Sequence, residues 1–393
     1  MVLAAGERGG VRVALISNLL PGPGRGGAER YAGMLAAGLA GRGHEVVLHS
    51  GEAGAVPGVA CRKLPGLRPL DPQTSGAGKA AWHAREQWLP RVHRSLRASL
   101  RATRPHVVHS HEPQLLSAAV FTAIAAERLP HVHTAHDFNL LCARVTMTHD
   151  GRPCGGRCAD CRIQRAIRVR ALRRRLDRLV APSDFVRERH VAHGVVPRER
   201  AVTIRHGAEP GSRRVRRRTP GRLAVGFLGT LAPHKGVRTL LRAAVAMPPG
   251  WRLALAGAGP LEGEVRAAAA NDPRIGFAGE LDAAGRDAFL DGLDVLAIPS
   301  EWEEPATLVA VEAAVRGLPA VVSDRGGLPE TPHAVTFPAG DADALLAALA
   351  TFVQEPDALE RRSRALVEAG DAFAWTTHLD AVEALLAETA EGR

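Results

Sequence analysis

Aromatic residues, lysine and long apolar segments are all scarce in this sequence. Phe, Trp and Tyr together make up 4% of the 393 residues. Proteins that bind single-stranded nucleic acid stack bases on aromatic side chains, so we expect no nucleic-acid partner. The longest uncharged apolar stretch, near residues 118–126, is far too short to span a bilayer. The N-terminal segment lacks a charged region followed by an apolar run, so we expect no signal peptide and a cytoplasmic protein.

Positive charge is abundant, and nearly all of it comes from arginine. The formal net charge is +10 at pH 7. A basic balance favours acidic partners such as nucleotides or anionic lipid surfaces. Because Lys63, Lys79 and Lys235 are the only lysines, the arginine excess indicates a compositional bias and is a weak indicator of function. For the same reason Lys235 stands out, since lysine occupies a position where this chain usually places arginine.

Strand-like and helix-like segments alternate in both halves of the chain. In the first half, a β-branched strand at 11–17, a glycine loop and a helix at 28–40 lead into a second strand at 45–49. The second half opens with the same succession, from a strand at 223–229 to a helix at 237–246. This alternation predicts an α/β protein with two doubly wound Rossmann-like domains and a cleft between them.

The division between the two halves is predicted from composition. A basic run at 213–218, followed by Pro220, has the character of a linker. We therefore place an N-terminal domain at 1–210 and a second domain at 211–372. Within the first domain, one helix is expected over 80–103.

Two glutamates, Glu304 and Glu312, lie eight residues apart behind an apolar run at 293–298 that is typical of a buried strand. Pro305 and Thr307 favour a helix start between them. Glu304 is then expected in the strand-to-helix loop and Glu312 about a turn and a half inside the helix. Taken alone, both could also be ordinary helix-end charges.

The same helix start predicts a phosphate site. The backbone amides of Leu308 and Val309 are expected to point at whatever Glu304 faces, and helix N-termini bind anions. Carboxylates for sugar hydroxyls beside amides for a diphosphate are the groups that a nucleotide-sugar site needs.

Two glycine loops add to this pattern. Gly26 and Gly27 follow a strand and open a helix, which supplies amides to an anion. Their spacing does not fit the dinucleotide fingerprint, and the second strand ends without an acid, so NAD is disfavoured. The second loop ends at Lys235, which can neutralise a diphosphate as a point charge. His136 follows a buried strand, a placement that favours a site residue over a surface one, although a hydrogen-bonded structural histidine is the alternative.

These segments closely resemble retaining glycosyltransferases of the GT-B fold, in glycosyltransferase family four. The resemblance rests on the Glu304-x7-Glu312 motif with its Gly-x-Pro-x-Val continuation at 317–321, and on Gly-Gly-x-Glu at 26–29. It also rests on the Lys-Gly loop that ends at residue 236. It is strong from about residue 223 to 341.

The resemblance implies roles for residues of both halves. Glu304 is expected to contact the donor sugar and Glu312 the ribose, while His136 lies near the reacting centre. Lys235 with the amides of Gly26 and Gly27 would face the donor phosphates. Two further positions are implied in the second half, a turn at Gly257 and a nucleobase contact near Leu281.

One position departs from the family pattern. Thr230 stands where an arginine is usual, so one of two expected cations at the diphosphate is absent unless Arg205 or Arg325 reaches the site. The resemblance also implies that the terminal segment, 373–393, is a helix that crosses back to the first domain with Trp375 as its anchor. From the sequence alone, a simple C-terminal helix on the second domain is equally compatible.

Four cysteines form a separate cluster in a glycine-rich loop, namely Cys142, Cys154, Cys158 and Cys161. Thiols stay reduced in the cytosol, so a structural zinc site is more plausible than disulfides. The spacing departs from paired Cys-x2-Cys units. Free thiols and a redox pair therefore remain as alternatives to zinc.

A strongly basic stretch at 165–178 carries apolar residues at helical spacing. It could lie on an anionic membrane surface, giving the protein a peripheral membrane association. A solvated basic face on a core helix is the alternative. No aromatic residue interrupts this stretch, which again argues against nucleic acid.

The sequence as a whole predicts a metal-independent retaining glycosyltransferase. It would move a sugar from a nucleotide-sugar donor to an acceptor hydroxyl on a glycan, a lipid-linked molecule or a small molecule. A nucleotide-sugar epimerase on the same fold is the nearest alternative. A non-catalytic basic binding protein is the other, and Thr230 is the feature that favours it.

Overall fold

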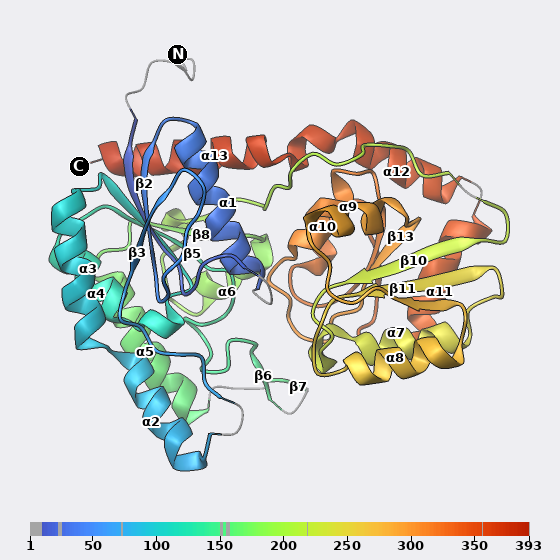
Figure 1. Cartoon of the computed structure of the whole chain (residues 1–393), viewed down its shortest axis with the longest axis horizontal. Helices are drawn as coiled ribbons and strands as arrows, with labels where there is room; N and C mark the ends of the chain where they lie inside the picture. The colour runs from blue at the N-terminus through green and yellow to red at the C-terminus, as the bar shows by residue number, and fades with distance from the viewer. Residues whose placement is uncertain are drawn as a thin grey trace.

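Two parallel sheets, one in each half of the chain, organise the computed structural model (Figure 1). The structure describes residues 10–22, 26–71, 74–149, 152–154, 158–217, 219–355 and 357–392. Every pairing within the two large sheets is parallel. This confirms the predicted fold class of two doubly wound α/β units.

The first sheet has seven strands in the order β3-β2-β1-β4-β5-β8-β9 and the second has six in the order β12-β11-β10-β13-β14-β15. The strands of the first sheet are β1 (Arg12–Ile16), β2 (Glu45–Ser50), β3 (Ala60–Lys63), β4 (Val107–His111), β5 (His131–Thr134), β8 (Arg178–Ala181) and β9 (Ala201–Thr203). Those of the second are β10 (Leu223–Leu228), β11 (Trp251–Ala256), β12 (Ile275–Phe277), β13 (Val295–Ile298), β14 (Ala320–Ser323) and β15 (Val335–Phe337). A small antiparallel hairpin joins β6 (Thr148–His149) to β7 (Arg152–Pro153).

Helices cover both faces of each sheet (Figure 1). Those that follow first-sheet strands are α1 (Gly27–Gly41), α2 (Gly76–Gln87), α3 (Pro90–Thr103), α4 (Ala119–Ala126), α5 (Ala159–Arg173) and α6 (Asp184–Ala192). The remaining ones are α7 (Val237–Val245), α8 (Glu262–Asn271), α9 (Ala283–Asp291), α10 (Leu308–Ala314), α11 (Ala342–Gln354), α12 (Ala358–Glu368) and α13 (Trp375–Glu391).

The strands form because their apolar, β-branched runs can be buried on both sides. Parallel sheets are covered by helices on both faces, so their strands are apolar at nearly every position. Each sheet accordingly has one apolar cluster on each face. In the first unit, Leu96 and Phe121 lie in one cluster, and Tyr31 and Leu35 lie in the other.

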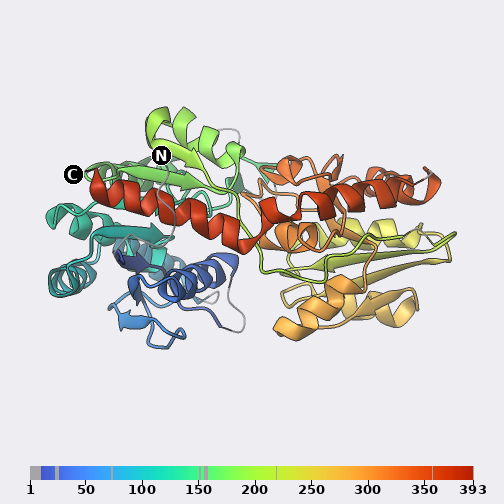
Figure 2. The same cartoon turned by 90° about the horizontal axis from the view of Figure 1, so that it is seen from above.

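The terminal helix α13 lies on the first unit although it follows the second in the chain. Trp375 and Leu379 are buried in the same apolar cluster as Tyr31. Gly38 of α1 permits this approach, because a Cβ there would lie 2.9 Å from Leu379 Cδ2. Figure 2 shows α12 and α13 running one after the other across both units.

The single helix predicted over 80–103 was wrong. The structure has two helices, because α2 ends at Gln87 and Trp88 adopts an extended conformation with φ −160° and ψ 125°. Pro90 then begins α3. A proline has no backbone N–H and disfavours a helical residue before it, so the break follows from Pro90 itself.

The strand order reverses at β1 in the first sheet and at β10 in the second. In open α/β sheets, ligands bind outside the carboxyl ends of the strands at such a reversal. The loops that leave β1, β4 and β5 and those that leave β10 and β13 therefore mark the expected site. No helix in the described ranges is long and apolar enough to cross a membrane.

Candidate active site

The Glu304 carboxylate is buried and held by three side chains of the second unit. Lys235 Nζ lies 2.9 Å from each of its oxygens. Ser300 Oγ donates to Oε2 at 2.9 Å, and Trp302 Nε1 donates to the same oxygen at 2.7 Å. Only 4% of Glu304 is exposed, so its charge is compensated at short range. A carboxylate in this setting is oriented before any ligand arrives.

Backbone contacts fix the loop that carries Glu304. Gly326 has φ +63°, and a Cβ there would lie 2.2 Å from the carbonyl oxygen of Glu304. The amide of Gly327 donates to that same oxygen at 2.7 Å. Glycine is thus required at residue 326 both for its left-handed backbone and for the close approach.

Trp302 connects this loop to the first unit. Its side chain belongs to the first unit's apolar cluster that contains Leu96 and Phe121, although the residue follows β13 of the second sheet. Lys235 Nζ lies 5.0 Å from the centroid of the Trp302 ring, within cation–π range. The loop that carries Glu304 therefore contacts both units through Trp302.

Glu312 lies in α10 and pairs with an arginine from each unit. Arg30 of α1 places Nη1 2.5 Å from Glu312 Oε1, and Arg286 of α9 places Nη2 2.6 Å from Oε2. The helix begins where it was expected to begin, because Thr307 caps it by accepting a hydrogen bond from the amide of Ala310 at 3.1 Å. Sequence reasoning missed both arginines.

Gly27 and Leu308 bring the two helix starts together. A Cβ at Gly27 would lie 3.6 Å from Leu308 Cδ1. The Leu308 side chain packs against the first unit's apolar cluster that contains Tyr31 and Leu35. The first-turn amides of α10, including those of Leu308 and Val309, have no intrahelical acceptor. Gly26 is the N-cap of α1 and Gly27 is its first residue. Because both are glycines, no side chain from either of them covers this junction. Residues 23–25 of the first glycine loop lie outside the described residues.

His136 lies two residues beyond the end of β5, in a cluster of aromatic rings. Its Nε2 is 3.0 Å from His111 Nδ1, its ring stacks on His206 at 5.7 Å, and the Tyr31 ring is 4.8 Å away. Burial lowers the pKa of His136 to about 3 and that of His111 well below its usual range. Both rings are therefore neutral near pH 7, and one nitrogen of the pair donates while the other accepts.

Two carboxyls follow these histidines and were missed by the sequence reasoning. Glu112 follows His111 at the end of β4, and Asp137 follows His136 after β5. Burial raises the pKa of Asp137 to about 6. Burial, and then the neighbouring charges of Asp137 and Glu29, raise the pKa of Glu112 well above its usual value. The repeated His-acid pair after adjacent strands was the available signal.

The other predicted donor residues follow β10, β11 and β12. Thr230 is exposed just beyond the end of β10. Gly257 has φ +132°, and a Cβ there would lie 1.9 Å from the carbonyl oxygen of Gly229, so these two loops touch through backbone alone. Leu281 is half-buried against the apolar cluster beneath α10. Arg325 Nε lies 3.5 Å from Asp324 Oδ1.

Comparison with known proteins assigns the family. Residues 25–211 match the model of glycosyltransferase family 4, and residues 222–355 match that of glycosyl transferases group 1. This chain is a family 4 glycosyltransferase. Its relatives include a glycogen synthase of Mycobacterium tuberculosis, 29% identical over 90% of this chain and 89% of that protein. A D-inositol 3-phosphate glycosyltransferase of Mycolicibacterium smegmatis is also 29% identical, over 70% of this chain and 65% of its own length.

Solved structures show the same GT-B fold. Sucrose-phosphate synthase from Thermosynechococcus elongatus aligns over 98% of this chain and 100% of its own, with a TM-score of 0.74 at 20% identity. Anabaena HepE in complex with UDP-glucose aligns over 96% and 100%, with a TM-score of 0.71 at 17% identity. At these identities, the likeness supports the fold of the glycosyltransferase alone.

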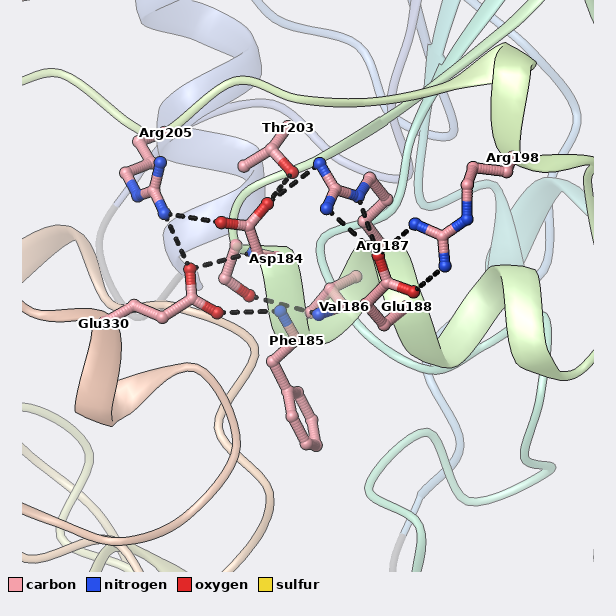
Figure 3. Close-up of polar contacts among 10 residues, drawn as sticks. Asp184, Phe185, Val186, Arg187, Glu188, Arg198, Thr203, Arg205 and Glu330 are labelled. Atoms are coloured by element: carbon pink, nitrogen blue, oxygen red, sulfur yellow. Dashed lines mark hydrogen bonds and ion pairs between the residues drawn. The ribbon is translucent and has the colours of Figure 1, made fainter.

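A second set of contacts joins the two units of the glycosyltransferase on α6 (Figure 3). Glu330 of the second unit accepts hydrogen bonds from the amides of Asp184 and Phe185 at 2.9 and 2.7 Å. Arg205 Nη2 bridges Glu330 Oε2 at 3.0 Å and Asp184 Oδ2 at 2.8 Å. A carboxylate of one unit thus caps a helix of the other. Arg205 is engaged in these contacts, and its reach to a diphosphate, in place of the missing arginine at residue 230, stays a prediction.

The four cysteines of the predicted zinc site are free thiols in the structure of the transferase. Cys142 and Cys161 are buried with their sulfurs 3.9 Å apart, whereas Cys154 and Cys158 are exposed. Backbone amides donate to three of the sulfurs at 3.4 Å, those of Cys142, Cys158 and Cys161. Within the described ranges, which omit 155–157, no group of three or more His, Cys, Asp or Glu side chains is arranged to hold a metal ion. The zinc site stays a prediction.

Proposed function

We propose that this glycosyltransferase moves a sugar from a nucleotide-sugar donor to an acceptor hydroxyl with retention of anomeric configuration and without a metal ion. The observation that carries the proposal is the pair of buried carboxylates, Glu304 and Glu312, which flank the start of α10. Lys235 pairs with Glu304, and Arg30 and Arg286 both pair with Glu312, so each carboxylate charge is compensated. Carboxylates that can accept hydrogen bonds from sugar hydroxyls thus lie beside cations that can bind phosphate.

The donor would lie across this junction. Glu304 would accept hydrogen bonds from the hydroxyls of the donor sugar. Glu312 would accept hydrogen bonds from the hydroxyls of the ribose, which would replace part of its contact with Arg30. Lys235 and the free amides of α10 would hold the diphosphate. Anabaena HepE, which shares the fold, was solved in complex with UDP-glucose, and this supports a donor of the same class.

The acceptor would enter from the first unit, past His136. Its oxygen would bond to the anomeric carbon on the face that the diphosphate leaves, as the carbon–oxygen bond to phosphate breaks. The acceptor's proton would pass to the departing diphosphate oxygen. Because His136 is neutral, it can donate a hydrogen bond to a donor hydroxyl without adding a charge at the reacting carbon. Closure of the units around both substrates would exclude water.

The stereochemical part of the proposal can be tested without knowing the acceptor. Water replaces the acceptor slowly when a transferase is incubated with donor alone, so proton NMR can follow UDP-, GDP-, dTDP- and ADP-sugars and the anomer that each releases first. We expect one nucleotide series to be consumed and the released sugar to keep the donor's configuration. First release of the opposite anomer would contradict retention. Conversion of the donor to another nucleotide sugar would identify an epimerase.

A further inference from the structure

We propose that the first unit docks on an anionic lipid bilayer through an exposed face made by α5 and Trp88. We call this surface the α5 face, and it consists of Trp88, Ile163, Ala166, Ile167, Arg170, Arg173 and Arg174. The exposed fractions are 47% for Trp88, 61% for Ile163 and 38% for Ile167. Within the described ranges, the one other large hydrophobic side chain with such exposure is Val245, on the second unit.

The exposed residues of α5 repeat at helical spacing. Ile163, Ile167, Arg170 and Arg174 follow one another at intervals of three or four residues, so they share one side of the helix. The opposite side, with Val169 and Leu172, is buried in the first unit's core. The helix therefore has a second apolar strip that its own domain does not cover.

Trp88 extends this strip beyond α5. Trp88, Ile167, Arg170 and Arg174 line one hollow between α3, α4 and α5. The Trp88 indole nitrogen donates to Thr122 Oγ1 at 3.2 Å, which fixes the ring while nearly half of it faces solvent. A tryptophan with one polar and one apolar edge is suited to the boundary between headgroups and acyl chains.

Charge selects the partner. Arg170, Arg173 and Arg174 are exposed, and in the described part of the chain no ion pair joins them to a carboxylate. By contrast, Arg97 and Arg101 nearby share Glu127. An apolar strip rimmed by unpaired arginines matches an anionic headgroup layer above acyl chains. A second copy of this chain fits poorly, because two arginine clusters would face each other.

The test is co-sedimentation of the full chain with vesicles, without donor or acceptor, so its result is independent of the transferase proposal. We expect binding to vesicles of phosphatidylcholine with about 30% phosphatidylglycerol, little binding to phosphatidylcholine alone, and loss of binding as salt is raised. Changing Ile163→Ser with Ile167→Ser should weaken binding at least tenfold. The change of Arg170, Arg173 and Arg174 to Gln should do the same, because each basic residue at an anionic surface contributes about fivefold.

Matched controls lie on the second unit. Val245→Ser removes an apolar side chain that is more exposed than those of the α5 face, and Arg364→Gln removes an exposed arginine. Both should leave vesicle binding unchanged. Melting curves of every variant establish that it is folded. No binding by the wild type to anionic vesicles, or equal binding by the α5 variants, overturns the proposal. A concentration-dependent dimer in sedimentation velocity that Ile163→Ser with Ile167→Ser abolishes would also overturn it, by assigning the face to a second copy.

Discussion

The two halves of the active site are built on different principles. In the second unit, Glu304 is surrounded by fixed partners, namely Lys235, Ser300 and Trp302, all within 2.9 Å of its oxygens. In the first unit, the site residues are the neutral histidines His111 and His136, and two carboxyls whose pKa values burial has raised. The proposed donor side is thus preorganised with permanent charges, while the charge on the proposed acceptor side depends on pH.

This difference accords with the separate tasks that we propose for the two sides. A nucleotide diphosphate carries a fixed charge that needs a fixed counter-charge, and preorganised groups stabilise developing charge without reorganisation cost. An acceptor hydroxyl is neutral and needs hydrogen-bonding groups. Mutation and pH should therefore affect the two sides differently.

The largest effect is expected at Glu304. Glu304→Gln keeps the shape but removes the charge that pairs with Lys235, so kcat/KM for sugar transfer or donor hydrolysis should fall about 100-fold or more. Steady-state kinetics would measure it. Glu264→Gln is the control, because Glu264 forms a surface pair with Arg238. Equal activity of Glu304→Gln and wild type would show that the donor side does not depend on this carboxylate.

Lys235 should show a smaller but related loss. Lys235→Met leaves Glu304 without its cation and the diphosphate without a point charge, so we expect KM for the donor to rise and kcat to fall, by about tenfold or more together. Lys235→Arg should recover part of the activity. If Lys235→Met changed neither constant, the lysine would serve the fold of the loop alone.

The acceptor side should respond to pH through Asp137. Its pKa is raised to about 6 by burial, so the carboxyl is protonated below that pH and ionised above it. An ionised carboxylate accepts a hydrogen bond from an acceptor hydroxyl, so activity should rise severalfold between about pH 5 and 7. A pH–rate profile would measure this rise, and Asp137→Asn should abolish it. An unchanged profile in the variant would assign the rise in activity to another group.

Stability should also depend on pH, through the buried histidines. Burial lowers the pKa of His131 to about 3 and that of His190 to about 4, from 6.5. Below pH 6.5 the unfolded chain binds more protons than the native one, so stability is full above that pH and falls toward pH 4. Each such histidine removes up to about 1.4 kcal/mol per pH unit in that window. Asp137, whose pKa is raised from 3.8 to about 6, acts oppositely between those two values. Urea unfolding at pH 7.5 and 5 would contradict the account if the midpoints coincided.

The smallest effect on stability is expected from Arg30, which joins the two units at Glu312. Its side chain is 41% exposed, and exposed ion pairs contribute about 0–1 kcal/mol. Arg30→Gln should therefore shift the free energy of unfolding by less than about 1 kcal/mol, while it changes the affinity for a nucleotide that shares Glu312. Denaturant unfolding and nucleotide titration of the same variant separate the two effects.

The fold and the positions of the acid pair could be predicted because they depend on local pattern. The strand before Glu304 and the cap at Thr307 are readable from a few neighbouring residues. Pro90 carried the signal for the break between α2 and α3, and it was overlooked. The roles assigned to Glu304, Glu312 and Lys235 and the domain limits remain predictions.

The missed contacts depend on how the two units meet. Arg30 and Glu312 are far apart in sequence, and Trp302 packs into an apolar cluster of the first unit. Glu330 likewise pairs with α6 only across the joint. No periodicity or local motif encodes such pairings, since they are fixed by the orientation of the two units.

The most direct test of the account is the melting temperature of the glycosyltransferase with UDP, GDP, dTDP, ADP and their sugars, for wild type, Glu312→Gln and the surface control Glu388→Gln. A ligand that binds the folded state raises the melting temperature by mass action. The account predicts stabilisation by one nucleotide series in the wild type and in the control, and its loss in Glu312→Gln. Stabilisation by none of them, with all proteins folded, would contradict a nucleotide-sugar site at Glu304 and Glu312.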